Sequence, residues 1–371
     1  MSTSGREPAP SPPWARHLRS TLDALSIYDV PPADASFARL HANECPEPWP
    51  PEVMDALAEV VRGLELGRYP DTSGRRLRAT LGQRYGCDPG RVVLGNGSDE
   101  IIALLLMALS SPGRPGVVVT PAPTFVMYAH TARVLGMEVR EVLLTEDLQL
   151  SGPAMYEALR GATVCFLARP NNPTGSLWDA GLIGELVAAH PEVVFVIDEA
   201  YAGYAPPGTS LWDPDAPSNQ VHMATLSKVG LAALRVGYCI AHPDLARAMN
   251  TVRHPYNVSQ TSLSLAQAVL ERFGDAQQAM VATARDNRDR LARVLGAIEG
   301  ASVLPSAGNM VLVRLRGDDD APRLREHLAQ RAILVKDVSA LPRLQRCLRV
   351  SVGTRAELDR LATALASFRP D

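Results

Sequence analysis

Val193-Val-Phe-Val-Ile-Asp-Glu-Ala-Tyr201 is an apolar run that ends in two carboxylates. Five apolar residues without a break, most of them β-branched, predict a strand that is buried on both faces. Asp198 follows at once, and a carboxylate beside apolar chain needs a compensating positive partner. For an isolated Asp-Glu pair a helix N-cap is the better explanation, so the segment by itself predicts a central strand with a polar end whose role depends on the other motifs.

Similar runs recur along the chain and alternate with amphipathic segments. The other expected strands are Arg91–Leu94, Val117–Thr120, Thr163–Ala168, Val221–Thr225 and Val236–Ala241. The expected helices between them include Asp99–Leu109, Tyr128–Leu135 and Ala180–Ala189. Apolar strands alternating with helices predict an α/β fold whose sheet is mainly parallel and covered on both faces.

The remaining sequence divides the chain into four expected segments. Residues 1–15 are rich in proline and predict a flexible tail, and residues 16–45 predict an arm that joins the small domain. We expect a large domain at 46–250 and a smaller α+β domain at 251–371. Within the latter, residues 262–298 have a helical pattern throughout, and Ser302–Ser351 mixes strands with helices.

Composition excludes several classes of function. Lys+Arg is 37 and Asp+Glu is 40, so a net charge of −3 gives no reason to expect nucleic acid or an anionic membrane as a partner. No apolar run is long enough to span a bilayer, and the N-terminus lacks the apolar core of a secretory signal. The five cysteines are scattered without a CxxC pair, which predicts a reducing cytoplasm, no disulfide framework and no thiolate metal site.

Lysine is rare in this chain. Only Lys228 and Lys336 are lysines among the 37 basic residues, and the others are arginines. An ammonium group can lose its proton and attack a carbonyl, whereas a guanidinium cannot. Each lysine is therefore a candidate for amine chemistry, although chance survival is an equal explanation without further context. Lys228 follows a predicted strand, while Lys336 lies beside one and is expected at the surface or at an inter-domain contact.

A glycine-rich turn joins a predicted strand to a predicted helix at Gly97, Ser98 and Asp99. Glycine lets the backbone approach a ligand, and the helix N-terminus offers free N–H groups to an anion. Arg235, just before another strand, can add a guanidinium. The turn is neither a P-loop nor a dinucleotide fingerprint, which argues against a nucleotide-binding protein.

An anion pocket, an amine and a carboxylate together suit pyridoxal 5′-phosphate. Its phosphate fits the turn and Arg235, and its aldehyde fits the amine of Lys228. Its ring nitrogen needs a carboxylate such as Asp198, and its ring oxygen needs donors such as Tyr201 and Asn172.

The order of these motifs resembles the class I/II aminotransferases of fold type I, and more narrowly the histidinol-phosphate aminotransferases. Each motif is weak alone, but their order from residue 41 to 354 is specific. The motifs are His41-Ala-Asn-Glu-Cys-Pro46, Arg68-Tyr-Pro-Asp71, Gly95-Asn-Gly-Ser-Asp-Glu-Ile-Ile102, Pro123-Thr-Phe-Val-Met-Tyr128, Pro170-Asn-Asn-Pro-Thr-Gly175, Asp198-Glu-Ala-Tyr201, Thr225-Leu-Ser-Lys228 with Gly230-Leu-Ala-Ala-Leu-Arg235, and Leu348-Arg-Val-Ser-Val-Gly-Thr354.

The resemblance implies a role for each matching residue. Lys228 would be the Schiff-base lysine and proton carrier, Asp198 would pair with the ring nitrogen, and Tyr201 with Asn172 would bind the ring oxygen. Phe125 would stack on the ring, although a plain core role fits it too. The phosphate would be held by Gly97, Ser98, Asp99, Thr225, Ser227 and Arg235.

Three further residues are implied to contact the substrate or the neighbouring subunit. Tyr69 would reach the cofactor phosphate of the neighbouring subunit, which implies an obligate homodimer with shared active sites. Asn43 and Arg349 would meet the substrate, with Arg349 taking a carboxylate or a phosphate. Cys45 stands where the family usually has asparagine, which bears on the choice of substrate.

The implied activity is transfer of an amino group between L-histidinol phosphate and 2-oxoglutarate, in histidine biosynthesis. Two alternatives share the same chemistry: an aromatic or broad-specificity amino-acid aminotransferase, and a pyridoxal-phosphate decarboxylase of a phosphorylated amino acid. A cofactor-sensing regulator would need a DNA-binding domain, for which the segment before His41 is too short and too rich in proline.

Overall fold

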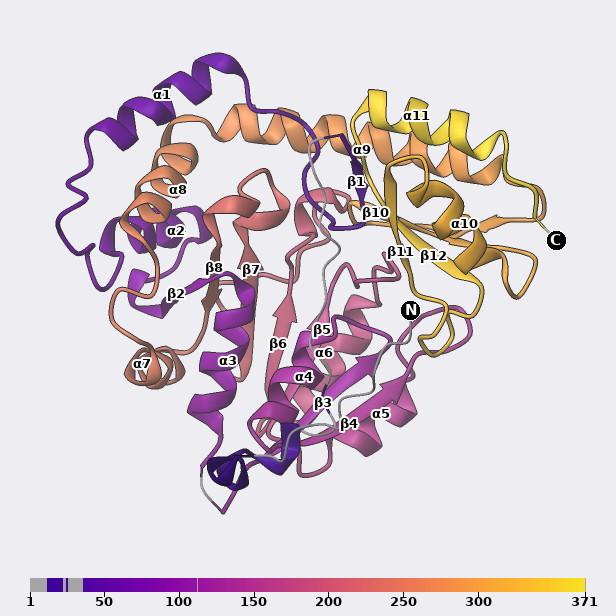
Figure 1. Ribbon diagram of the computed structural model, residues 1–371. Helices are drawn as coiled ribbons and strands as arrows, with labels where there is room; N and C mark the ends of the chain where they lie inside the picture. Colours follow the sequence, from indigo (N-terminus) through magenta and orange to yellow (C-terminus); the bar gives the residue numbers. More distant parts are fainter. Residues whose placement is uncertain (1–11, 23–24, 26–35, 112, 371) are drawn as a thin grey trace.

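The computed structural model describes residues 12–22, 25, 36–111 and 113–370, which form two β-sheets with helices packed against both (Figure 1). The larger sheet has seven strands. In order across the sheet they are β2 (Val92–Asn96), β8 (Val236–Ile240), β7 (Gln220–Thr225), β6 (Val194–Asp198), β5 (Val164–Ala168), β3 (Val117–Ala122) and β4 (Glu138–Leu143).

The strands of the larger sheet run parallel, except that β8 is antiparallel to both β2 and β7. The predicted mainly parallel α/β fold is therefore confirmed. The sequence did not predict β4, which reads Glu138-Val-Arg-Glu-Val-Leu143 and lies at the edge of the sheet. An edge strand carries charges and is only partly buried, so it lacks the continuous apolar run of a central strand.

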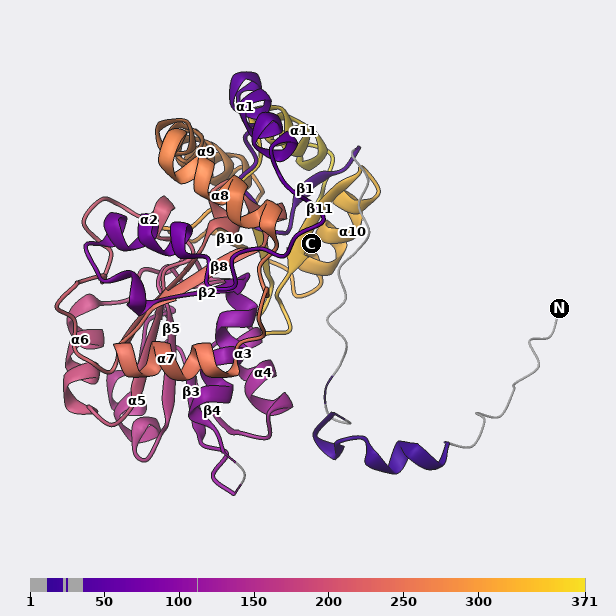
Figure 2. The same cartoon turned by 90° about the vertical axis from the view of Figure 1, so that its left-hand side faces the viewer.

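Helices cover both faces of the large sheet (Figure 2). Side chains alternate between the two faces along each strand, so neighbouring residues pack against different helices. Val196 and Phe166 pack with α3 (Ser98–Leu109), α4 (Met127–Val134) and α7 (Pro243–Val252). Ile197 and Leu167 pack with α5 (Gly152–Leu159) and α6 (Ala180–Ala189) on the other face. Towards β8, that second face is covered by α1 (Pro51–Arg62), α2 (Arg75–Tyr85) and α8 (Gln260–Arg272).

The smaller sheet combines one strand from the N-terminal part of the chain with four strands from its C-terminal part. Its order is β1 (Ala38–Leu40), β11 (Ile333–Asp337), β12 (Cys347–Ser351), β10 (Met310–Arg314) and β9 (Ser302–Val303). Its core is shared with α9 (Gly274–Gly296), α10 (Asp320–Ala329) and α11 (Arg355–Leu365). The pairing of β1 with β11 brings the segment that follows into the space between the two sheets.

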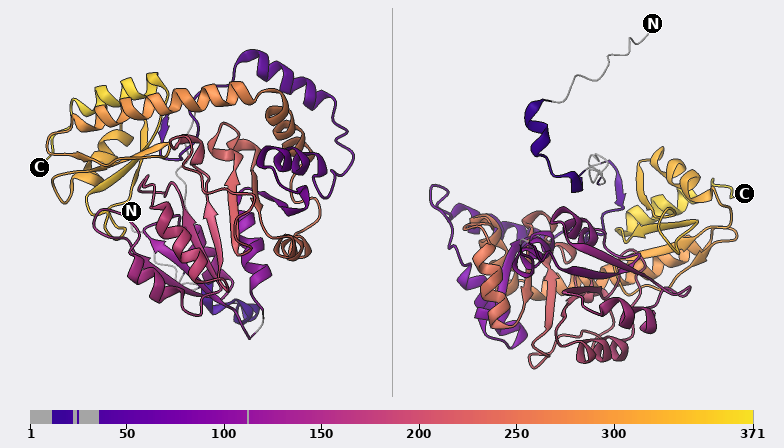
Figure 3. Two further views of the ribbon diagram at one scale, coloured as in Figure 1. Left: turned by 180° about the vertical axis from the view of Figure 1, so that it is seen from behind. Right: turned by 90° about the horizontal axis from the view of Figure 1, so that it is seen from below.

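The uninterrupted helical pattern predicted over 262–298 is wrong in one respect, because two helices occupy it. The chain leaves the helical conformation at Phe273, with φ −127° and ψ 23°, and α9 begins at Gly274. From there α9 extends along the small sheet (Figure 3), while α8 packs on α1 and α2 beside the large sheet. The domain limit at residues 250 and 251 stays a prediction.

Two predicted segments fall partly outside the described residues. These residues are 1–11 of the predicted tail, and 23–24 and 26–35 of the predicted arm. Within the rest, short 3-10 helices span Pro13–His17 and Ser20–Leu22. None of the helices in the described part of the chain is long and apolar enough to cross a membrane.

Candidate active site

A cavity of about 560 Å³ lies where the carboxyl ends of the large sheet's strands face the small sheet. Every predicted site residue except Gly97 and Tyr69 lines this cavity. The predicted residues in its wall are Asn43, Ser98, Asp99, Phe125, Asn172, Asp198, Tyr201, Thr225, Ser227, Lys228, Arg235 and Arg349. Residues at or just after the carboxyl ends of β2, β3, β5, β6 and β7 thus meet residues of the small sheet in one space.

The start of α3 forms one corner of this cavity. Gly97 has φ +81°, and a Cβ atom placed on it would lie 2.5 Å from the guanidinium of Arg235. Arg235 contacts Asp99 Oδ2 at 3.2 Å and Ser227 Oγ at 3.4 Å, and Thr225 donates to the same Ser227 oxygen at 3.0 Å. A helix N-terminus, a guanidinium and hydroxyl groups in one corner suit a phosphate group.

Asp198 lies at the end of β6 and is only 5% exposed. Its carboxylate accepts hydrogen bonds from the Tyr128 hydroxyl and from the Ala200 N–H at 2.9 Å. Burial raises the pKa of Asp198, and these two donors oppose that rise. A positively charged N–H facing this carboxylate would relieve the cost of burying it.

Tyr128 is a site residue for which sequence reasoning found no role. It is fully buried in α4, stacks on Phe166 with 4.7 Å between ring centroids, and meets the edge of Phe125 at 5.5 Å. The sequence motif included Tyr128, but its partner Asp198 is 70 residues away. The packing of α4 on the sheet, where Tyr128 stacks on Phe166 of β5, brings the two together.

Lys228 ends the 3-10 turn Leu226–Lys228 that follows β7. Its Nζ atom lies 5.8 Å from the centroid of the Tyr201 ring, and its positive charge lowers the pKa of Asp198. The Tyr204 hydroxyl donates to the Lys228 carbonyl, which fixes the backbone of the turn. The amine and the carboxylate that the sequence singled out therefore share one cavity.

The small sheet supplies the opposite wall. Arg349 donates to Asn172 Oδ1 at 2.7 Å and to the carbonyl of His41. Asn43 donates to the Tyr201 hydroxyl at 3.1 Å. Since Asn172 accepts from Arg349 through its oxygen, its amide nitrogen is left as a donor.

Lys336 also lies in this wall, directly opposite Arg349 across the pair β11–β12. Sequence analysis placed Lys336 at the surface or at an inter-domain contact and did not assign it to the site. The register of two antiparallel strands decides its position, and no local pattern around Lys336 reports that register. Two cationic side chains therefore lie side by side on one face of the small sheet.

Tyr69 is not brought to this cavity. It is 80% exposed and stacks on Tyr256 with 4.5 Å between ring centroids. Its predicted role in a neighbouring subunit stays a prediction. Among the described residues, no group of three or more His, Cys, Asp or Glu side chains could hold a metal ion.

Comparison with known families identifies the chain. Residues 36–365 match the family model described as aminotransferase class I and II. The chain is a class I and II aminotransferase. It is 41% identical over 372 residues to the histidinol-phosphate aminotransferase of Methylibium petroleiphilum, covering 98% of this chain and 97% of that one. It is 39% identical to histidinol-phosphate aminotransferase 1 of Burkholderia lata, with 95% and 98% covered.

Solved structures agree with the fold of this aminotransferase. The histidinol-phosphate aminotransferase of Sinorhizobium meliloti, in complex with pyridoxal 5′-phosphate, superposes with a TM-score of 0.83 at 25% identity, covering 94% of this chain and 96% of that one. Class I and II aminotransferases depend on pyridoxal phosphate. The cavity fits this cofactor, because Arg235 and Gly97 form a close cradle at a helix N-terminus and the hydroxyl of Ser227 lies beside the guanidinium.

Removing the hydroxyl of Tyr128 tests whether it stabilises the carboxylate of Asp198. Without cofactor, we expect Tyr128→Phe to lower the free energy of unfolding by about 1–3 kcal/mol at neutral pH, because a buried acceptor loses its donor. The lost donor raises the pKa of Asp198 further, so the deficit grows as pH rises and shrinks as acid protonates the carboxyl in both proteins. Urea unfolding at several pH values measures this difference.

Tyr156→Phe is the matched control, because Tyr156 is 37% exposed. We expect its effect to stay below about 0.5 kcal/mol at every pH. A loss in Tyr128→Phe that does not change with pH would show that the hydroxyl acts through packing alone.

Proposed function

We propose that this aminotransferase transfers an amino group between L-histidinol phosphate and 2-oxoglutarate in histidine biosynthesis. The names of relatives about 40% identical to this chain support that substrate. The observation that carries the proposal is the pair Lys336 and Arg349 in the wall of the cavity that also holds Lys228. Two cationic donors on one face of the sheet can bind one anionic group together.

The residues of the large sheet hold the cofactor in this proposal. When bound, pyridoxal phosphate supplies an aldehyde that joins amines and a ring that draws electrons from the reacting carbon. Asp198 keeps a proton on the ring nitrogen, while Tyr201 and Asn172 donate to the ring oxygen. Phe125 covers one face of the ring. The phosphate is bound by Gly97, Ser98, Asp99, Thr225, Ser227 and Arg235.

Lys228 and the small sheet act on the substrate. The Nζ atom of Lys228 takes up and returns the proton of the reacting carbon, as a positioned general base does. Arg349 binds the carboxylate of glutamate or the phosphate of histidinol phosphate, with Asn43 beside it. Lys336 adds a second positive charge for the phosphate. One pair of cations can thus serve both half-reactions, because the two anions occupy the site in turn.

Borohydride trapping tests the assignment of the amine. We expect reduction of the holoenzyme to attach the cofactor permanently to Lys228, as peptide mapping detects, and glutamate to bleach the visible absorption band of the unreduced wild type. Lys228→Ala should lack both the linkage and the transaminase activity. Attachment to Lys336 instead would overturn the assigned roles.

Substitution of Lys336 tests whether the enzyme recognises the phosphate of its substrate. We expect Lys336→Met to lower kcat/KM for L-histidinol phosphate about 10- to 100-fold, the effect of losing a charged hydrogen bond of about 1.5–3 kcal/mol. The reaction of L-histidinol, which lacks the phosphate, should change little. Lys336→Arg keeps the charge and should retain most of the preference for the phosphorylated substrate.

The same assays separate the alternatives. An unchanged ratio of kcat/KM between L-histidinol phosphate and L-histidinol in Lys336→Met would place the phosphate elsewhere. A wild-type enzyme that prefers L-phenylalanine as amino donor would favour the aromatic or broad-specificity aminotransferase. Release of carbon dioxide from a phosphorylated amino acid would favour the decarboxylase.

We further propose that the enzyme is a homodimer in which Tyr69 completes the site of the partner subunit. Exposed apolar side chains support this arrangement, because a surface of this kind suits burial against a second copy. Tyr69 and Tyr256 stack on each other while exposed to solvent. Further exposed apolar residues lie nearby in sequence at Met54, Val61 and Leu66. A reducing cytoplasm is the proposed location, since all five cysteines are free.

Mixing two inactive variants tests the shared site. Tyr69→Ala and Lys228→Ala should each have low activity alone. After the subunits are exchanged, activity should return, because a mixed dimer has one site with an intact Lys228 and an intact Tyr69 from the other subunit. If Tyr69 served its own subunit, mixing would restore nothing.

A further inference from the structure

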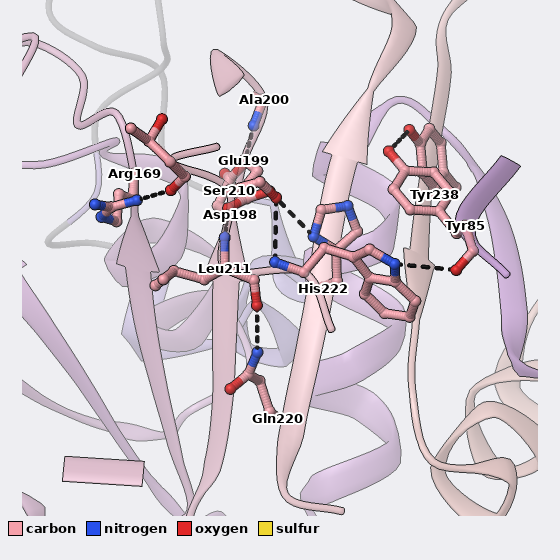
Figure 4. Close-up of polar contacts among 12 residues, drawn as sticks. Tyr85, Arg169, Asp198, Glu199, Ala200, Ser210, Leu211, Gln220, His222 and Tyr238 are labelled. Atoms are coloured by element: carbon pink, nitrogen blue, oxygen red, sulfur yellow. Dashed lines mark hydrogen bonds and ion pairs between the residues drawn. The ribbon is translucent and has the colours of Figure 1, made fainter. Parts of the chain in front are cut away.

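The two consecutive carboxylates at the end of β6, those of Asp198 and Glu199, lie on opposite faces of the large sheet. Asp198 follows the alternation of Val196 and faces α4, whereas Glu199 follows that of Ile197 and faces the other side. A second cavity of about 640 Å³ lies on that other side, between the sheet and α2, α8 and α9. Glu199, His222 and Tyr238 line its inner side, and Figure 4 shows how these side chains lie.

His222 is a buried polar residue that forms no side-chain hydrogen bond with the described residues. It is 3% exposed, and its ring contacts those of Tyr85 and Trp212, with centroids 5.1 and 5.3 Å away, while these two rings also contact each other. Neither ring nitrogen has a hydrogen-bond partner within the described residues, and the nearest charged group is Glu199, 3.5 Å from Nδ1. Burial lowers the pKa of His222 to about 4, so the ring is neutral and keeps an acceptor nitrogen.

Glu199 adds a negative charge beside this acceptor. Its carboxylate accepts from the Ser210 hydroxyl and from the Leu211 N–H, each at 2.6 Å (Figure 4). Both donors are neutral. The guanidinium of Arg169 also acts on this carboxylate and lowers its pKa, but its hydrogen bonds go to the carbonyls of Trp178 and Thr209. The inner wall therefore favours a positively charged donor, such as an ammonium group, and the aromatic rings around His222 favour it too.

The outer wall has the opposite charge. Arg285 of α9 donates to the carbonyls of Gly203 and Ala205, and its buried Nε has no partner within the described residues. Arg84 lies at the exposed end of α2 and lines the same cavity. Across the part of the chain that the structure describes, neither arginine forms an ion pair with a carboxylate. Leu81, Leu270 and Val281 supply apolar surface in the same lining.

We propose that this second cavity is a binding site for a free amino acid in its zwitterionic form. The ammonium group of the amino acid lies against Glu199 and His222, and its carboxylate binds Arg285 and Arg84. An apolar side chain of the amino acid packs against Leu81 and Leu270. Ala200 and Thr225 line both cavities, so the occupant of one contacts the back of the wall that holds the cofactor site. The inference does not depend on which substrate the aminotransferase uses.

Calorimetric titration of borohydride-reduced holoenzyme tests the proposal, because amino acids cannot react at a site closed by reduction. The probes are L-leucine and L-phenylalanine, together with 4-methylpentanoate and 3-methylbutylamine, which each keep one charge of leucine. We expect at least one of the amino acids to bind and both single-charge compounds to bind about tenfold more weakly or not at all. Failure of both amino acids to bind the wild type would overturn the proposal.

Variants locate the bound amino acid. Arg285→Met removes the carboxylate partner, and Ala282→Tyr fills the cavity from an exposed position of α9 that lines it. Each should weaken binding about tenfold or more, while Arg285→Lys should keep most of it. Arg349→Met, in the active-site cavity, is the control and should leave this binding unchanged. Loss in Arg349→Met, or full binding in both Arg285→Met and Ala282→Tyr, would assign the bound amino acid to the active site and overturn the proposal.

Discussion

A carboxylate buried at the end of β6 is the constraint on which the active site depends. Removing Asp198 from water costs several kcal/mol unless donors and a positive charge replace the lost hydration. The Tyr128 hydroxyl and the Ala200 N–H supply the donors, and Lys228 supplies charge from the turn after β7. The positions of α4, of the chain after β6 and of the turn after β7 are thus fixed around one side chain.

The small sheet is tied to this arrangement by hydrogen bonds and not only by apolar contact. Arg349 of β12 donates to Asn172 of the large domain and to the carbonyl of His41, and Asn43 donates to Tyr201. Because β1 pairs with β11, the chain after β1 is held between the two sheets. A substrate anion at Arg349, as proposed above, would contact a group that already links both halves of the molecule.

Sequence alone predicted the parts of the site that lie next to strand ends. The strand Val221–Thr225 was visible from its residues, and Lys228 follows it in the chain, so the position of the amine required no long-range information. Tyr128 and Lys336 were not assigned, because their places depend on helix packing and on strand register. The edge strand β4 was missed for a related reason: the apolar pattern that marks a strand comes from burial, and its residues are largely exposed.

Glu199 is a buried carboxylate like Asp198, but the proposed reaction does not use it. Both are 5% exposed, burial raises the pKa of both, and both accept hydrogen bonds from neutral donors. In the proposed function the charge of Asp198 meets the ring nitrogen of the cofactor, and the charge of Lys228 lowers the pKa of Asp198. Within the described residues, the guanidinium of Arg169 lowers the pKa of Glu199, but its hydrogen bonds go to the carbonyls of Trp178 and Thr209, and the neighbouring imidazole of His222 is neutral. A buried charge that the proposed reaction does not use is costly to keep, and a cationic group bound in the second cavity would offset that cost.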